Sequence, residues 1–314
     1  MITISRTNQL DNSLELTDTI VEHCWIHMIN PSDSEVEQVS RVTGITDVML
    51  KSALDEEETA HTDTELDNTL VVVDIPSLEE ENDNIVYTTM PLGIIMNENY
   101  IVTVALRDSS LLNDFLNERV RGFNTNNQSK FLLQILYRNA TKFLQQLRMI
   151  DKTSHRLQAE LHKSMKNKEL ISLLELEKSL VYFSTSLRAN EVVIDRVSKF
   201  EFIKSDIVNL NLLDDLIIEN KQAIEMCNIY SNILSGTMDA FASIISNNVN
   251  LVMKLLTIIT IILTVPTLIA SFWGMNVPVP FEKNSLGFWI VVGIAVVVTL
   301  GVAFVLVKRT NRLK

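Results

Sequence analysis

Five hydroxyl side chains recur at three- or four-residue spacing within one otherwise apolar segment: Thr257, Thr260, Thr264, Thr267 and Ser271. Residues three and four apart share one face of an α-helix, so the five would form a single polar stripe. The same spacing extends back through Met253 to Asn250. Such a stripe can line water, or its threonines can bond to carbonyls of their own helix and face lipid or a neighbouring helix. The regularity favours a water-lining face, and because one helix cannot enclose a pore, several copies would have to surround it.

The chemistry of this stripe is that of neutral oxygen atoms. It contains no Asp, Glu, His or Cys, so it suits neither a soft metal ion nor a titratable proton relay. Neutral oxygens suit a hard cation that keeps most of its water, and Mg²⁺ holds its hydration shell most firmly. Pro266 removes one backbone hydrogen bond midway, so we expect it to bend the helix or to free a carbonyl toward the pore.

Two charge-free segments indicate membrane-spanning helices. Residues 255–273 number 19 and residues 286–307 number 22, and each is long enough as a helix to cross about 30 Å of hydrocarbon. Basic residues flank them at Lys254 and in the tail 308–314, whereas the link between them carries only Glu282 and Lys283. The positive-inside rule therefore predicts a multi-pass protein of the cell membrane, inner or plasma, with both termini cytoplasmic. The first residues lack an apolar run and predict no signal peptide.

Composition excludes several other classes. Residues 1–120 hold 5 Lys+Arg and 24 Asp+Glu, a net charge of −19, so nucleic acid is not an expected partner. None of the eight glycines forms a nucleotide-binding loop, so neither nucleotide-driven transport nor a cofactor is expected. The histidines show no metal-ligand spacing, which argues against an enzyme. The only two cysteines, Cys24 and Cys227, are expected to be structural thiols.

The first 120 residues mix strand and helix signals. Segments rich in β-branched and aromatic residues predict strands at 1–5, 24–30, 68–76, 84–90 and 100–106. The run 90–93, Met-Pro-Leu-Gly, predicts a break between two strands. Ser32 or Ser34 can cap a helix over 35–42, and a second helix is expected over 46–54. These signals together predict a β-sheet flanked by helices.

After Gly122 the pattern is helical. Apolar spacing predicts an antiparallel pair over 130–165 and 168–200, and a third helix that starts near Leu213 and runs without a stop to Pro266. The apolar stripe of this third helix repeats about every 3.5 residues, which predicts packing against parallel copies of itself. The stalk therefore runs directly into the first membrane segment.

Trp273 is followed by Gly274, Met275 and Asn276 at the outer end of that segment. A Gly-Met-Asn tripeptide that ends the first of two C-terminal membrane helices resembles the signature of the CorA magnesium channel family. The resemblance extends through 235–239 and 250–257 to the basic tail, and so covers about residues 210–314 closely. The first 200 residues match the family in general layout only.

The resemblance implies a funnel-shaped homopentamer whose first membrane helix lines the pore. Each α+β subunit would have an N-terminal cytoplasmic α/β/α sandwich, long stalk helices and the two membrane helices. Gly274, Met275 and Asn276 match the selectivity motif that holds hydrated Mg²⁺. Asn250, Met253 and Leu256 match the narrow cytoplasmic half of the pore, and Thr267 matches a pore threonine. Asp215 falls at the inter-subunit regulatory magnesium site, although a solvated acid near the helix start is an equal alternative.

Three departures from the family pattern bear on ion preference. Trp273 replaces the usual tyrosine, Thr264 stands where an apolar residue is common, and the link lacks the usual acidic run. The leading hypothesis is a magnesium-selective channel that moves hydrated Mg²⁺ inward and is gated by cytoplasmic Mg²⁺. The alternatives are a zinc, cobalt or nickel transporter of the same fold and a membrane-anchored structural or signalling protein whose helices merely dimerise.

The sequence also predicts the division of the chain. The expected regions are an acidic α/β domain at 1–122, a helical region and stalk at 123–250, a pore helix at 251–273, an outer loop at 274–285, a second membrane helix at 286–307 and a basic tail at 308–314.

Overall fold

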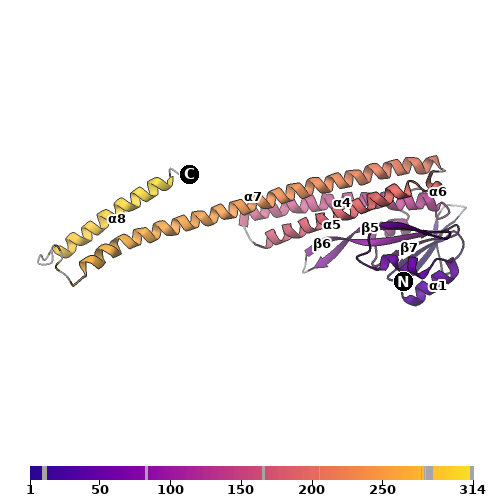
Figure 1. Cartoon of the computed structure of the whole chain (residues 1–314), viewed down its shortest axis with the longest axis horizontal. Coiled ribbons are helices and arrows are strands. Elements are labelled where there is room, and N and C mark those ends of the chain that lie inside the picture. The colour runs from indigo at the N-terminus through magenta and orange to yellow at the C-terminus, as the bar shows by residue number, and fades with distance from the viewer. Residues whose placement is uncertain are drawn as a thin grey trace. The chain divides into compact units, whose positions relative to one another are not determined.

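A computed structural model describes residues 1–8, 13–81, 84–164, 167–204, 206–276, 278, 280 and 286–311. Two compact units divide the chain, an N-terminal unit of Met1–Met238 and a C-terminal unit of Asp239–Lys314. The N-terminal unit holds a sheet with helices on both of its faces, and the C-terminal unit is formed by helices. Figure 1 shows the elements of the chain in order.

The sheet has seven strands in the order β2-β1-β3-β7-β6-β5-β4. Of its neighbouring pairs only β3 and β7 run parallel; the others are antiparallel. The strands span β1 Ile2–Thr7, β2 Leu14–Thr17, β3 Trp25–Ile29, β4 His61–Glu65, β5 Asn68–Glu81, β6 Asn84–Met96 and β7 Ile101–Ala105.

The predicted break at residues 90–93 is wrong, because β6 continues through it. β5 and β6 pair from Thr69 opposite Met96 to Glu81 opposite Asn84 without interruption. Pro91 lies one residue outside the stretch of β6 that pairs with β7, a place where a strand tolerates a residue without an N–H. Gly93 is there for packing, since a Cβ added to it would lie 2.9 Å from the Cβ of Ala53.

One face of the sheet is covered by α1 (Asp33–Thr43), α2 (Asp47–Lys51) and a 3-10 turn, η1 (Ser52–Leu54). Ser32 caps α1: its side chain accepts from the N–H of Glu35, whose carboxylate in turn accepts from the N–H of Ser32. This capping box confirms the predicted helix start. Apolar side chains of α1 and α2 pack against Ile26, Val72 and Val102 of the sheet.

The opposite face is covered by α3 (Ser110–Leu116), α4 (Gln128–Ser164) and α5 (Asn167–Val197), with the short α6 (Glu201–Lys204) nearby. The core on this side gathers aromatic rings around Trp25, whose ring centroid lies 5.1 Å from that of Phe131. Helices on both faces of one sheet confirm the predicted α/β/α sandwich and the predicted helical pair.

The outer edge of β5 is closed by side chains of the helices. β4 pairs with β5 only as far as Val72. Beyond it, the carboxamide of Asn190 on α5 accepts from the backbone N–H of Asp74 at 2.9 Å and donates to its carbonyl at 2.8 Å. Asn139 on α4 donates to the same carbonyl at 2.8 Å. One asparagine side chain therefore makes both hydrogen bonds that a neighbouring strand would make.

The third long helix, α7, spans Ile207–Trp273 and so begins one to two turns before the predicted start. In the N-terminal unit its buried seam includes Leu216, Ala223 and Cys227. The seam packs on α5 of the same chain, since the Cys227 thiol donates to the Leu180 carbonyl at 3.3 Å. The prediction that the stripe packs on parallel copies is wrong here, because α5 supplies the apolar partner.

Both cysteines are free and buried, as predicted for structural thiols. Burial raises the pKa of the Cys227 thiol to about 11. It therefore stays protonated and serves as a donor in the core.

The C-terminal unit contains the remainder of α7 and the helix α8, Gly287–Asn311. α7 continues as a helix through Pro266, as the absence of an earlier stop signal predicted. α7 and α8 are both long and apolar enough to cross a membrane. Of the predicted outer loop and basic tail, Val277, Val279, residues 281–285 with Glu282 and Lys283, and residues 312–314 lie outside the described residues.

Candidate functional site

The threonine stripe lies on the face of α7 that points away from α8. Thr257, Thr260, Thr264, Thr267 and Ser271 are all exposed, and they fall within about a third of the helix circumference. The half-buried residues of the same stretch lie on the opposite side of the helix: Ile258, Ile262, Val265, Pro266, Ile269 and Trp273. Pro266 and Ala270 line a groove with Val292, Ala295 and Val296 of α8, so the half-buried side is the one that packs on α8.

Each threonine of the stripe donates its hydroxyl proton to the carbonyl four residues earlier. The distances are 2.8 Å for Thr257 to Met253, 2.8 Å for Thr260 to Leu256, 2.7 Å for Thr264 to Thr260 and 2.8 Å for Thr267 to Leu263. This is the back-bonding that the sequence left open as an alternative. It does not remove the hydroxyls from the surface, because each oxygen keeps its acceptor lone pairs. The exposed face is therefore a row of hydrogen-bond acceptors.

Three further predicted site residues continue this face toward the N-terminal end of the C-terminal unit. Asn250, Met253 and Leu256 are exposed, the last two by 56% and 55%. Met253 and Leu256 interrupt the polar row with bulky apolar side chains. The structure therefore places all eight predicted pore residues on one helix face.

The tripeptide Gly274, Met275 and Asn276 follows directly on the end of α7, and all three residues are exposed. The N–H of Gly274 donates to the Ala270 carbonyl at 3.0 Å, and that of Met275 donates to the Phe272 carbonyl at 3.4 Å. The backbone φ of Gly274 lies outside the left-handed region, so no glycine-only conformation is needed. A Cβ on Gly274 would instead lie 3.3 Å from the Ala270 carbonyl oxygen.

Pro266 does not face the threonines. It lies on the side of α7 that packs on α8, and so does Ile262, whose carbonyl loses its helical partner because proline has no N–H. The expected release of a carbonyl toward the threonine face is therefore wrong. The helical period explains this, since Pro266 and Ile262 are four residues apart and lie opposite Thr260 and Thr264.

Asp215, the predicted regulatory ligand, is exposed on α7 within the N-terminal unit. It lies on the face opposite the buried seam, at helical spacing from the exposed apolar side chains of Ile218, Ile229 and Ile233. Among the described residues, no group of three or more His, Cys, Asp or Glu side chains is placed to hold a metal ion.

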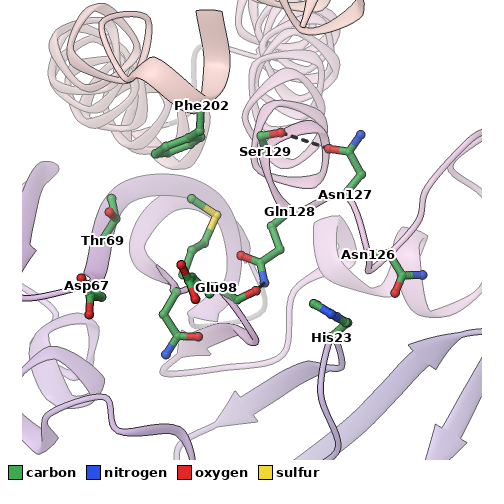
Figure 2. A pocket seen from close by; sticks show the side chains of 11 residues that line it. His23, Asp67, Thr69, Glu98, Asn126, Asn127, Gln128, Ser129 and Phe202 are labelled. Atoms are coloured by element: carbon green, nitrogen blue, oxygen red, sulfur yellow. Dashed lines mark hydrogen bonds between the residues drawn. The ribbon is translucent and has the colours of Figure 1, made fainter. Parts of the chain in front are cut away.

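A polar cavity of about 480 Å³ lies elsewhere in the N-terminal unit, at the N-terminal end of α4 (Figure 2). The carboxylates of Asp67 and Glu98, the imidazole of His23 and the ring of Phe202 line it. On α4, Ser129 donates to the Asn127 carboxamide at 3.0 Å. None of the residues singled out by sequence lines this cavity.

One contact next to the tripeptide had no sequence prediction. The indole N–H of Trp273 donates to the carbonyl of Pro280 at 3.1 Å. The sequence feature that could have indicated this contact is the composition of the link, because Pro278 and Pro280 supply no backbone donors.

The chain is similar to known proteins over most of its length. The model of the CorA-like Mg²⁺ transporter family matches residues 21–309. The chain is 27% identical over 281 residues to the cobalt/magnesium transport protein CorA of Methanocaldococcus jannaschii, covering 88% of this chain and 87% of the relative. It is 24% identical over 309 residues to the magnesium transport protein CorA of Campylobacter jejuni, covering 94% and 92%.

The fold is also similar to that of a solved structure over nearly the whole chain. The complete structure of the CorA magnesium transporter from M. jannaschii superimposes with a TM-score of 0.83 at 24% identity, covering 97% of this chain and 96% of that one. With a family match over most of its length, two apolar helices at its C-terminal end and the Gly-Met-Asn tripeptide between them, the chain belongs to the CorA-like Mg²⁺ transporter family.

Proposed function

We propose that the protein is a magnesium-selective channel through which hydrated Mg²⁺ moves into the cell along the threonine face of α7. The carrying observation is the row of exposed threonine oxygens whose protons are donated to backbone carbonyls. The waters around a cation point their protons outward, so a wall that only accepts hydrogen bonds complements a hydrated cation. Keeping the waters avoids the large cost of dehydrating Mg²⁺.

A pore needs several copies of this face. The exposed apolar side chains of Ile218, Ile229 and Ile233 run along the free side of α7 and are suited to packing between copies. A homopentamer, as the family resemblance implies, would bring five threonine faces around one axis. Five Asn276 side chains would then ring the outer mouth, with their carbonyl oxygens able to accept from the waters of the cation.

Membrane potential alone can drive this transport. With both termini cytoplasmic, a divalent ion moving inward gains about 4.6 kcal/mol per 100 mV, at about 2.3 kcal/mol per charge. No nucleotide or other cofactor is required by this scheme. The partners are the other four copies of the chain in the homopentamer, divalent cations and the lipid bilayer.

Gating would use the acidic N-terminal unit. Residues 1–120 carry a net charge of −19, so such domains brought side by side repel one another unless cations lie between them. Cytoplasmic Mg²⁺ bound there would hold the closed state, and its loss would release the stalks, because a ligand favours the state that binds it better. Asp215, on the free side of α7, is the proposed ligand.

The ion preference separates this proposal from a zinc, cobalt or nickel transporter of the same fold. Residues 251–307 contain neither His nor Cys, the side chains that bind the softer ions best. Cobalt and nickel nevertheless remain candidates for passage as hydrated ions. The test must therefore compare the ions directly.

The experiment is flux into proteoliposomes under an imposed inside-negative potential, with a fluorescent Mg²⁺ indicator inside. We expect Mg²⁺ entry that rises with the potential and falls when Mg²⁺ is also present inside. Co²⁺ and Ni²⁺ should compete with it, and Zn²⁺ should compete less. Entry of Zn²⁺ in preference to Mg²⁺, or no cation entry under the same conditions, would contradict the proposal.

A further inference from the structure

The hydrogen bond from Trp273 to Pro280 encloses the Gly-Met-Asn tripeptide in a short loop. Trp273 is the last residue of α7, and its indole N–H donates to the Pro280 carbonyl at 3.1 Å across seven residues. Gly274, Met275 and Asn276 lie between the two partners. The bond therefore ties the far side of the loop to a helix end.

Four described residues of this stretch offer no free backbone donor to that carbonyl. Pro278 and Pro280 have no N–H. The N–H groups of Gly274 and Met275 already donate to carbonyls of the last turn of α7. The indole N–H of Trp273, a donor that cannot act as an acceptor, makes the hydrogen bond to the Pro280 carbonyl that the structure shows.

Trp273 is well placed to act as an anchor. It is half-buried and lies on the face of α7 that packs on α8, four residues after the half-buried Ile269. Met275 and Asn276 are exposed. The ring is thus held by the helix, while the residues that it encloses face outward.

We propose that Trp273 is a positioning residue for the cation-binding mouth. Its indole N–H holds the Pro280 carbonyl, which restricts the conformations of Gly274–Asn276 and keeps the Asn276 carboxamide facing the hydrated cation. A closed loop has fewer conformations to lose when an ion binds, so closure strengthens binding without touching the ion. This inference rests on the proposed function, and it assigns a role to the tryptophan that replaces the tyrosine usual in the family.

The transport experiment uses the full chain in proteoliposomes. Trp273→Phe removes the N–H and keeps an aromatic ring, whereas Trp273→Tyr replaces it with a hydroxyl donor. Loss of one hydrogen bond should raise the half-saturating Mg²⁺ concentration about three- to tenfold in the phenylalanine variant. Maximal flux should change less than about twofold, and the tyrosine variant should recover much of the affinity.

Trp289→Phe is the matched control. Trp289 lies on α8, is 69% exposed, and its ring contacts Phe288 at a centroid distance of 5.4 Å. The same substitution there should leave the half-saturating concentration unchanged. Trp273→Phe with wild-type affinity, or a tyrosine variant as impaired as the phenylalanine variant, would overturn the positioning role.

The hydrogen bond itself can be tested without transport. The chain has three tryptophans, so ¹⁵N-indole NMR in lipid nanodiscs gives three signals that single Trp→Phe variants assign. The Trp273 indole proton should exchange with water several-fold more slowly than that of Trp289. Equal exchange would overturn the inference even if transport is normal. Wild-type protein that carries no Mg²⁺, together with slow Trp273 exchange, would overturn the proposed function instead.

Discussion

The hydroxyl of Thr264 donates to the carbonyl oxygen of Thr260 at 2.7 Å, and the hydroxyl of Thr260 donates one turn further back to Leu256 at 2.8 Å. Two successive turns of α7 therefore present oxygen acceptors on the same exposed face. Thr299 of α8 makes the same bond, to Ala295 at 2.6 Å, but on a helix outside the proposed pore. Thr299 therefore serves as a control for Thr260 and Thr264, because its hydrogen bond is the same and only its helix differs.

The first prediction is that Thr260→Val and Thr264→Val each lower Mg²⁺ conductance several-fold. Valine keeps the side-chain shape and removes the acceptor that the water of a hydrated cation would use. Thr299→Val should change flux by less than about twofold. Equal effects at all three positions, measured in the same proteoliposomes, would mean that the pore-lining helix is misassigned.

The second prediction concerns Asn276. Asn276→Ala removes the exposed carboxamide that follows α7 and should lower Mg²⁺ uptake tenfold or more, by about 1.5 kcal/mol of lost cation binding. Light scattering should show an unchanged oligomeric state. Wild-type flux in this variant would contradict the assignment of the mouth.

Gly274→Ala should also lower flux, although for a steric reason rather than a conformational one. The added Cβ would lie 3.3 Å from the Ala270 carbonyl oxygen, so the last turn of α7 must shift and move Asn276 with it. Gly274→Ser, which is larger still, should be impaired at least as much. A serine variant with higher flux than the alanine variant would argue against crowding as the cause.

The fourth prediction tests the regulatory role of Asp215. Asp215→Asn should weaken inhibition by internal Mg²⁺ and raise open probability, because one negative charge on the free side of α7 is lost. The neighbouring Asp214 is also exposed, so Asp214→Asn controls for charge alone. The measurement is a patch recording of channel current at increasing internal Mg²⁺ concentration. If internal Mg²⁺ inhibited both variants as strongly as the wild type, the ligand would lie elsewhere in the acidic unit.

The fifth prediction concerns packing of the sheet on η1. Gly93→Ala would place two Cβ atoms 2.9 Å apart and should lower the free energy of unfolding by about 1–3 kcal/mol. Ala53→Gly in the same chain should restore most of this loss.

Gly236 is a helical glycine with no atom within 4 Å of an added Cβ, so Gly236→Ala should stabilise by about 0.5–1 kcal/mol. Thermal unfolding of Gly93→Ala, of the double variant with Ala53→Gly and of Gly236→Ala measures these changes in stability.

A pH dependence of stability follows from His27. Burial of its ring in the core lowers its pKa from 6.5 to about 4, despite a hydrogen bond with Thr103 and the nearby Asp108, which favour the charged form. The unfolded chain therefore binds more protons than the folded chain between these values. Stability should be level above pH 6.5 and fall by about 3 kcal/mol as the pH drops to 4.

Denaturant titrations at several pH values test this, with His27→Gln as the comparison. The variant should lose most of the dependence between pH 6.5 and 4. If the stability of the variant depended on pH as steeply as that of the wild type, titratable groups other than His27 would be responsible.

Local patterns determined much of this protein. The threonine face follows from three- and four-residue spacing, and the helix start at Ser32 follows from its side chain and that of Glu35, because both depend on residues within one or two turns of each other. The length of α7 followed from the lack of a stop signal between Leu213 and Pro266. The tripeptide that ends α7 could also be identified from the sequence, since it follows directly on an apolar helix.

The tertiary structure decided what those elements pack against. The seam of α7 packs on α5, the threonine face is the one turned away from α8, and β6 continues through Pro91 because its pairing with β5 is uninterrupted. Asn190 with Asp74 and Gly93 with Ala53 are contacts between residues that lie far apart in the sequence. Such contacts depend on how whole elements come together in space, which is why only the folded chain shows them.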